Sequence, residues 1–158
     1  MSRRTLALLV PLLAALCLGC ATTGDGRLNL DREGVALGGY DPVSYHRRGP
    51  VPGSPRFTTR LDGATFRFES EESRTRFLQS PEYYLPLYGG WCAWAMADGE
   101  KVEVDPTCFL ATDDGLLLFY RSFLIDTRER WQRDDPARKK ALADEHWRTL
   151  EREAALTR

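Results

Sequence analysis

The residues best equipped for chemistry surround Cys92. Its thiol follows the glycine pair Gly89-Gly90 and lies between Trp91 and Trp94. Each tryptophan can bury more than about 100 Å² of surface. Paired glycines allow a tight turn or a close approach between two backbone segments. The segment therefore forms either the centre of a core or the wall of a binding site.

One chemistry for Cys92 is that of a reactive thiol. A short helix predicted over residues 91–97 would place Cys92 in its first turn, where free N–H groups and the helix dipole favour a thiolate. Thiol catalysis also needs an imidazole partner, and the sequence offers only His46 and His146. His146 falls on the apolar face of the last predicted helix, where a histidine is usually a packing residue. We therefore expect a protein that is not an enzyme, with a redox or catalytic thiol as the alternative.

A second chemistry combines Cys92 with Cys108. In an oxidising compartment the two thiols could form a disulfide, which would stabilise the fold by roughly 3 kcal/mol, or they could be buried separately. They could instead hold copper(I) or zinc together with a histidine, although the sequence contains no CxxC or HxxH pair. The candidate metal or ligand residues are Cys92, Cys108, His46, Ser44, Asp41 and Glu69.

Aromatic residues supply a third kind of candidate site. A flat or apolar ligand could lie among aromatic side chains, with Ser44, Asp41 and Cys92 as polar contacts. The aromatic residues in question are Tyr40, Tyr45, Tyr88, Trp91 and Trp94, and Tyr83 and Tyr84 lie in the same part of the chain. The same residues could also fill the core of a small domain, and we favour that interpretation.

Short elements must position these residues. Asp62-Gly63 and 113–115 are turn signals flanked by segments with strand character. Ser70, followed by two glutamates, predicts the start of a helix that ends near Pro81. The sequence predicts hairpins that pair 57–61 with 64–68 and 107–112 with 116–120, and helices over 43–45, 71–80, 81–84, 91–97, 122–133 and 136–153. In the last helix, one apolar face carries Leu142, Ala143, His146, Trp147 and Leu150. Short antiparallel hairpins packed with several helices define a small single α+β domain.

The N-terminal residues predict export. Arg3 and Arg4 precede an apolar run over residues 6–18, which is too short for a permanent membrane span and typical of a signal peptide over 1–19. Cys20 follows Leu-Cys-Leu-Gly, which is similar to a bacterial lipobox, so we expect Cys20 to carry a lipid anchor that includes palmitate. Residues 20–33 would form the lipidated N-terminus and a flexible tether, 34–153 the folded domain and 154–158 a tail.

Charge and export together limit the partners. Residues 1–19 carry two of the 22 Lys and Arg and none of the 23 Asp and Glu, so the rest of the chain has a net charge of −3. Nucleic-acid binding requires a basic balance, so we expect no nucleic-acid partner. We expect the protein in the bacterial cell envelope, attached through its lipid to a membrane that faces the periplasm.

Several motifs in one order make the chain similar to a known family. They are Gly39-Tyr40-Asp41-Pro42-Val43-Ser44-Tyr45, Gly63-Ala64-Thr65-Phe66-Arg67-Phe68, Phe77-Leu78 followed by Pro81-Glu82-Tyr83, Tyr88-Gly89-Gly90-Trp91-Cys92-Ala93-Trp94-Ala95, and Asp105-Pro106 followed by Phe109. Over residues 35–150 the chain resembles the YHS-domain family, in the version found in small exported bacterial proteins. The resemblance implies the family's small α+β fold.

The resemblance does not imply that this chain binds metal as the family's best-known members do. Domains attached to copper-transporting P-type ATPases look like metal binders, with cysteines at three positions that suit a soft metal. The corresponding residues here are Ser44, Glu69 and Ser73, and neither a serine hydroxyl nor a single glutamate suits copper(I).

These observations predict an exported, membrane-anchored YHS-type domain with a binding role. Its ligand would be a metal ion (copper or zinc) or a small molecule. A redox or catalytic thiol at Cys92 is one alternative, and a structural envelope module that binds an unknown protein partner is another. A Cys92 thiol far more reactive than a free cysteine would favour the first alternative.

Overall fold

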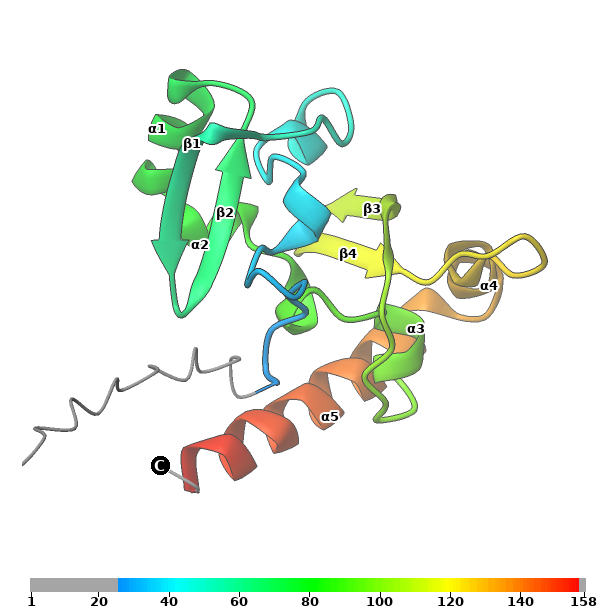
Figure 1. Cartoon of the computed structure of the whole chain (residues 1–158). Coiled ribbons are helices and arrows are strands. Elements are labelled where there is room, and N and C mark those ends of the chain that lie inside the picture. The colour runs from blue at the N-terminus through cyan, green and yellow to red at the C-terminus, as the bar shows by residue number, and fades with distance from the viewer. Residues whose placement is uncertain (1–25, 157–158) are drawn as a thin grey trace, which may run out of the picture.

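The computed structural model describes residues 26–156, which form a mixed α+β domain as predicted (Figure 1). Its strands are β1 (Ser54–Leu61), β2 (Ala64–Phe68), β3 (Asp105–Thr112) and β4 (Gly115–Phe119). Its α-helices are α1 (Glu71–Gln79), α2 (Pro81–Tyr84), α3 (Ala93–Met96), α4 (Thr127–Arg133) and α5 (Pro136–Leu156). Single 3-10 turns are η1 (Leu37–Gly39), η2 (Ser44–His46) and η3 (Leu87–Gly90).

The strands form two separate antiparallel hairpins, so both predicted hairpins are confirmed. β1 pairs with β2 around Asp62-Gly63, and β3 pairs with β4 around Asp113-Asp114. Asp62 and Gly63 both have positive φ, +49° and +84°, which is the geometry of a tight two-residue hairpin turn. Local turn chemistry therefore accounts for the first hairpin, and the second turn was also correctly located from its residues.

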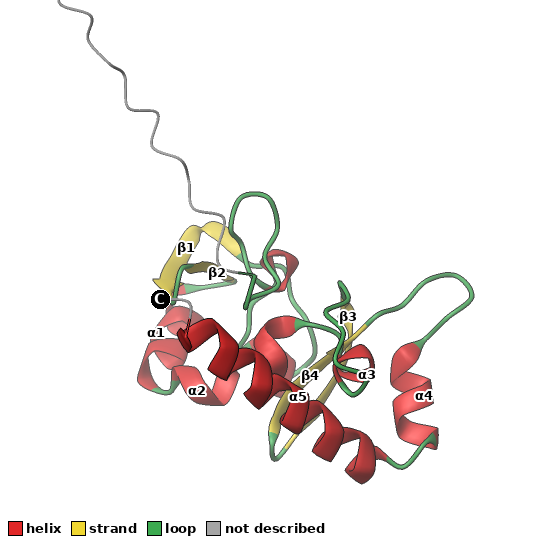
Figure 2. Ribbon diagram, turned by 90° about the horizontal axis from the view of Figure 1, so that it is seen from below, coloured by secondary structure: helices red, strands yellow, loops and turns green. Residues whose placement is uncertain are grey.

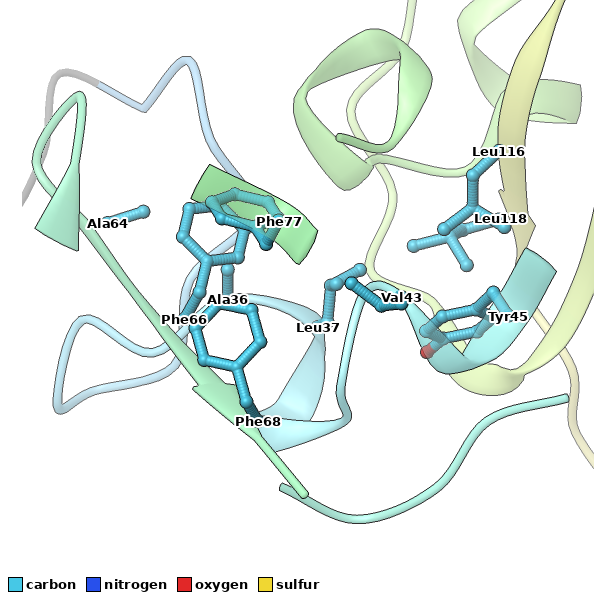
Figure 3. Packing of buried hydrophobic residues seen from close by; sticks show 10 residues of the cluster. All are labelled: Ala36, Leu37, Val43, Tyr45, Ala64, Phe66, Phe68, Phe77, Leu116 and Leu118. Atoms are coloured by element: carbon cyan, nitrogen blue, oxygen red, sulfur yellow. The ribbon is translucent and has the colours of Figure 1, made fainter. Parts of the chain in front are cut away.

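Strand β4 divides the interior into two cores. Leu116 and Leu118 face what we call the hairpin core, whereas Leu117 and Phe119 face the helical core. This division follows from the alternation of side chains along a strand. The hairpin core contains Ala36, Leu37, Val43, Tyr45, Ala64, Phe66, Phe68, Phe77, Leu116 and Leu118, and Figure 3 shows its three phenylalanines gathered on one side. The helical core contains Tyr88, Ala93, Met96, Ala97, Cys108, Leu117, Phe119, Trp131 and Ala143.

Two helix starts show how capping sets the boundaries. The Ser70 hydroxyl accepts a hydrogen bond from the N–H of Ser73, so the predicted cap of α1 is confirmed. The helix predicted over 122–133 was wrong at its start, because α4 begins at Thr127. The Asp126 carboxylate accepts hydrogen bonds from the N–H groups of Arg128 and Glu129. Asp126 is therefore the N-cap, and residues 121–126 form a loop instead of a helical turn.

Helices α3 and α5 differ from their predicted lengths. α3 spans only Ala93–Met96, so Cys92 lies at its N-cap, and α5 continues to Leu156. The predicted apolar face of the last helix is confirmed, because Ala143 is buried and Leu142, Trp147 and Leu150 pack against the helical core. Figure 2 shows α5 running along one face of the molecule, with α3 beside its N-terminal half.

The predicted tether over 20–33 is too long at its C-terminal end. The N–H of Asn29 donates to the carbonyl of Gly89 at 2.8 Å, and Leu28 and Leu30 pack against the hairpin core. Burial of the two leucine side chains, together with this hydrogen bond, holds the segment against the domain. Cys20 and the signal peptide predicted over 1–19 lie outside the described residues. Within residues 26–156, no helix is long and apolar enough to cross a membrane.

Candidate functional site

A cavity of about 390 Å³ lies between the N-terminal segment, strand β2, the η3 turn and helix α5. Its walls are mainly apolar and are built from Leu28, Leu30, Ala36, Leu37, Ala64, Phe66, Leu85, Pro86, Leu87, Tyr88 and Trp147. Asn29, Asp144, Arg148 and Glu151 add polar atoms to the wall. Cavities of this size and composition are typical of sites for small organic ligands.

The Gly89-Gly90 pair shapes one wall of this cavity. Tyr88, Gly89 and Gly90 all have positive φ (+57°, +61° and +85°), so the chain turns sharply here. A Cβ on Gly89 would lie 2.2 Å from the carbonyl oxygen of Arg27 and 2.9 Å from the Trp147 ring. The first glycine is therefore required for a close backbone approach, as the sequence suggested. The indole N–H of Trp91 donates to the same Arg27 carbonyl at 3.0 Å.

Gly89→Ala should release the N-terminal segment from this turn. The added Cβ would clash with the Arg27 carbonyl, and an alanine at positive φ costs about 1–2 kcal/mol by itself. Gly63→Ala is the matched control, because Gly63 also has positive φ but nothing lies within 4 Å of its added Cβ. Hydrogen exchange at the Asn29 amide should accelerate strongly in Gly89→Ala alone. Equal protection of Asn29 in both variants would contradict this account.

Tyr88 and Asp144 form the main polar contact of the wall. The Tyr88 hydroxyl donates to Asp144 Oδ1 at 2.8 Å, and Lys140 Nζ lies 2.9 Å from Asp144 Oδ2. Burial and the neighbouring Asp144 carboxylate raise the pKa of Tyr88 far above its usual value. The phenol therefore remains a neutral hydrogen-bond donor, and it fixes α5 against the η3 turn.

Cys92 and Cys108 are both free and buried, so the disulfide considered from the sequence does not form. Cys92 is only 1% exposed, and its Sγ accepts a hydrogen bond from the Tyr120 N–H at 3.3 Å. Cys108 Sγ donates to Asp126 Oδ1 at 3.5 Å. Burial, with the Asp126 carboxylate adding to it, raises the pKa of the Cys108 thiol to about 11. Neither thiol lines the cavity: Cys92 contacts the residue that follows β4, and Cys108 links β3 to the N-cap of α4.

The metal site considered from the sequence is not assembled. Among residues 26–156, no group of three or more His, Cys, Asp and Glu side chains is placed to hold a metal ion. The two histidines make other contacts: His46 packs against Tyr83 with 4.7 Å between ring centroids, and His146 Nδ1 lies 3.2 Å from the Met96 carbonyl. Nε2 of His46 is buried with no hydrogen-bond partner among the described residues, and burial lowers the pKa of this imidazole.

The remaining candidate ligands form a structural network centred on buried Asp41. Asp41 Oδ1 accepts from the Val43 N–H at 2.8 Å, and Oδ2 accepts from the Glu69 N–H at 3.0 Å and from the Ser73 hydroxyl at 2.5 Å. The Ser44 hydroxyl donates to the Asp41 carbonyl at 2.7 Å. Positions 44, 69 and 73 therefore do lie together around Asp41. The Glu69 N–H and the Ser73 hydroxyl donate to its carboxylate, and the Ser44 hydroxyl donates to its backbone carbonyl. The Glu69 carboxylate pairs with Arg48.

The predicted pocket aromatics divide between the cavity and the cores. Of the five, Tyr88 lines the cavity. Tyr45 is buried in the hairpin core with Tyr40 packed against it, and its hydroxyl donates to the Pro106 carbonyl at 2.9 Å. Trp91 and Trp94 pack against the helical core, with Lys139 Nζ 4.1 Å from the centroid of the Trp94 ring. The core interpretation is thus correct for all five, and Tyr88, a member of the helical core, lines the cavity as well.

Sequence reasoning missed two parts of the cavity. Trp147 was identified only as a member of an apolar helix face, and the docked residues Leu28 and Leu30 were placed in a tether. The signal for Trp147 was its position on that apolar face, which could border a cavity as well as the helical core. For Leu28 and Leu30 the signal was their alternate spacing, typical of an extended segment with one face buried.

Comparison with known proteins gives no relative: no protein-family model, no curated protein sequence and no solved structure matches this chain.

Proposed function

We propose that this protein is an envelope-anchored, YHS-type binding domain whose ligand is a small, mainly apolar organic molecule. The observation that supports this function is the cavity between the N-terminal segment and α5. The YHS-type assignment and the lipid anchor rest on the sequence motifs given above.

The composition of the wall indicates the kind of ligand. Leu28, Leu30 and Phe66 supply apolar surface, which would stabilise a bound apolar group by roughly 25 cal/mol per Å² removed from water. The polar atoms belong mostly to α5, where Asp144, Arg148 and Glu151 carry charge of both signs. A ligand with an apolar body and one polar end matches this asymmetry.

The alternative chemistries have less support. A redox or catalytic thiol must be reached by its substrate, whereas Cys92 is almost fully buried and Cys108 has a raised pKa. A copper or zinc site needs three or four converging ligands, and the described residues do not bring them together. Apolar ligand binding needs neither feature.

The test is to extract small molecules from the protein purified from its own envelope and to identify them by mass spectrometry. The variant Leu28→Trp places a larger side chain at the cavity wall, and we expect it to lose at least about tenfold of the co-purified ligand. Leu78→Trp is the matched control, because Leu78 is 49% exposed on α1 and does not line the cavity.

Binding of the apolar dye 1-anilinonaphthalene-8-sulfonate provides a second readout that does not depend on recovering the natural ligand. We expect Leu28→Trp to weaken dye binding and Leu78→Trp to leave it unchanged. If neither a co-purified molecule nor dye binding distinguishes the two variants, the cavity is not the binding site.

A further inference from the structure

The loop between β4 and α4 holds two large apolar side chains in solvent. Phe123 is 100% exposed and Leu124 is 85% exposed. The loop projects from the body of the domain in both views (Figures 1 and 2). Two adjacent, exposed, large apolar side chains at the tip of a projecting loop mark a candidate contact site.

The loop is a short hairpin closed by backbone contacts. Arg121 and Asp126 form an antiparallel bridge, and the Ser122 N–H donates to the Ile125 carbonyl at 2.8 Å. Phe123 and Leu124 therefore occupy the two tip positions of a tight turn. Such positions usually carry Gly, Asn, Asp or Pro, because these residues suit the turn geometry and water. Phe123 and Leu124 do not stabilise the turn itself, so we look for their role in a contact with another molecule or surface.

The base of the hairpin is fixed to the domain. The Thr127 N–H and hydroxyl both donate to the Tyr120 carbonyl, at 3.1 and 2.8 Å. The Arg121 guanidinium donates to Asp105 Oδ2 at 2.8 Å and to the Thr107 hydroxyl at 2.6 Å. A loop held in this way loses little conformational entropy when its tip enters another phase.

We propose that the Phe123–Leu124 tip inserts into the interfacial region of a lipid bilayer. The two side chains offer on the order of 350 Å² of surface, whereas a stable protein interface needs about 800 Å² from each partner. A narrow apolar tip is too small for a protein interface, but it suffices for shallow insertion beside lipid headgroups.

Charge around the tip defines the kind of bilayer contact. Arg121 pairs with Asp105, and Arg128 pairs with Asp126, so the charges of these residues at the base of the loop cancel in pairs. Near the start of α5, two basic side chains are also engaged: Lys139 lies over Trp94, and Lys140 pairs with Asp144. Insertion is therefore driven by apolar burial, and it does not require anionic lipid.

The test uses an environment-sensitive nitrobenzoxadiazole probe on the mature, full protein. Leu124→Cys carries the probe at the tip, Leu78→Cys carries it on exposed α1, and the parent chain without an added cysteine gives the background. With phosphatidylcholine vesicles, we expect a blue shift and an increase in emission at position 124 alone. Adding Phe123→Ser should raise the lipid concentration for half-maximal response roughly tenfold. Phosphatidylglycerol should change that concentration by less than about twofold.

Three outcomes would overturn the proposal. The first is an unchanged spectrum at position 124 with vesicles. The second is a blue shift that depends on protein concentration without lipid, which would indicate a second copy of the chain as the partner. The third is a shift that requires an envelope protein fraction instead of lipid. The ligand cavity takes no part in this test, so its outcome does not depend on the proposed function.

Discussion

Phe77→Ala should destabilise the domain by about 3–5 kcal/mol, the usual cost of removing a fully buried phenylalanine ring. Phe77 has no exposed surface, and its ring centroid lies 5.1 Å from that of Phe66 and 5.2 Å from that of Phe68 (Figure 3). It connects α1 to strand β2, so its loss leaves a void at the centre of the hairpin core. A loss of this size is a large part of the 5–15 kcal/mol that stabilises a typical domain.

The control for this prediction is the next residue on the same helix. Leu78 is 49% exposed, so Leu78→Ala should change the free energy of unfolding by no more than about 1 kcal/mol. Urea unfolding followed by circular dichroism measures both variants. Similar midpoints for Phe77→Ala and Leu78→Ala would show that α1 does not pack as described.

Asp41→Ala should cost about 3–5 kcal/mol for a different reason. The Asp41 carboxylate accepts hydrogen bonds from Val43, Glu69 and Ser73, and each buried donor left without an acceptor costs about 1–3 kcal/mol. These contacts join the turn after η1, the end of β2 and the start of α1. The variant should therefore loosen this whole junction while leaving the β3–β4 hairpin intact.

Asp31→Ala is the matched control for Asp41→Ala. Asp31 Oδ1 also accepts two backbone hydrogen bonds, from Glu33 and Val35, but Asp31 is exposed. Water can replace a lost acceptor there, so the expected cost is only about 1 kcal/mol. Urea unfolding gives the two costs, and hydrogen exchange at the Glu69 amide locates the damage. Equal destabilisation by the two variants would mean that Asp41 is not the centre of a buried network.

Local signals predicted most of the secondary structure. Asp62-Gly63 specifies the first hairpin because few other residues adopt positive φ at both central positions, and Asp113-Asp114-Gly115 marks the second turn with residues that are common in turns. Ser70 specifies the start of α1 because its hydroxyl satisfies a free N–H. These are interactions between residues at most a few positions apart, so they can be recognised without the rest of the fold.

The start of α4 was predicted wrongly because two residues near it could each cap a helix. Ser122 and Asp126 are both suitable N-caps, and the apolar residues between them resemble the first turn of a helix. Asp126 wins because the Arg121 side chain is held by Asp105 and Thr107 and the Tyr120 carbonyl binds Thr127. Those partners come from elsewhere in the fold, and this is why the exposed Phe123–Leu124 tip could not be foreseen.

Short-range patterns in the sequence were enough to predict the α+β class, both hairpins, the capped helix α1 and the apolar face of α5, because each depends on periodicity or turn chemistry within a short window. The roles of the candidate site residues depend instead on contacts made across the whole domain. The tertiary structure buried Cys92 and Cys108 separately, enclosed the Asp41 carboxylate with Ser73 and the Glu69 amide, and built a cavity from Leu28, Tyr88 and Trp147. Which of these side chains meet depends on long-range packing of segments up to about 120 residues apart. Contacts between residues so far apart in the sequence cannot be predicted from a local pattern.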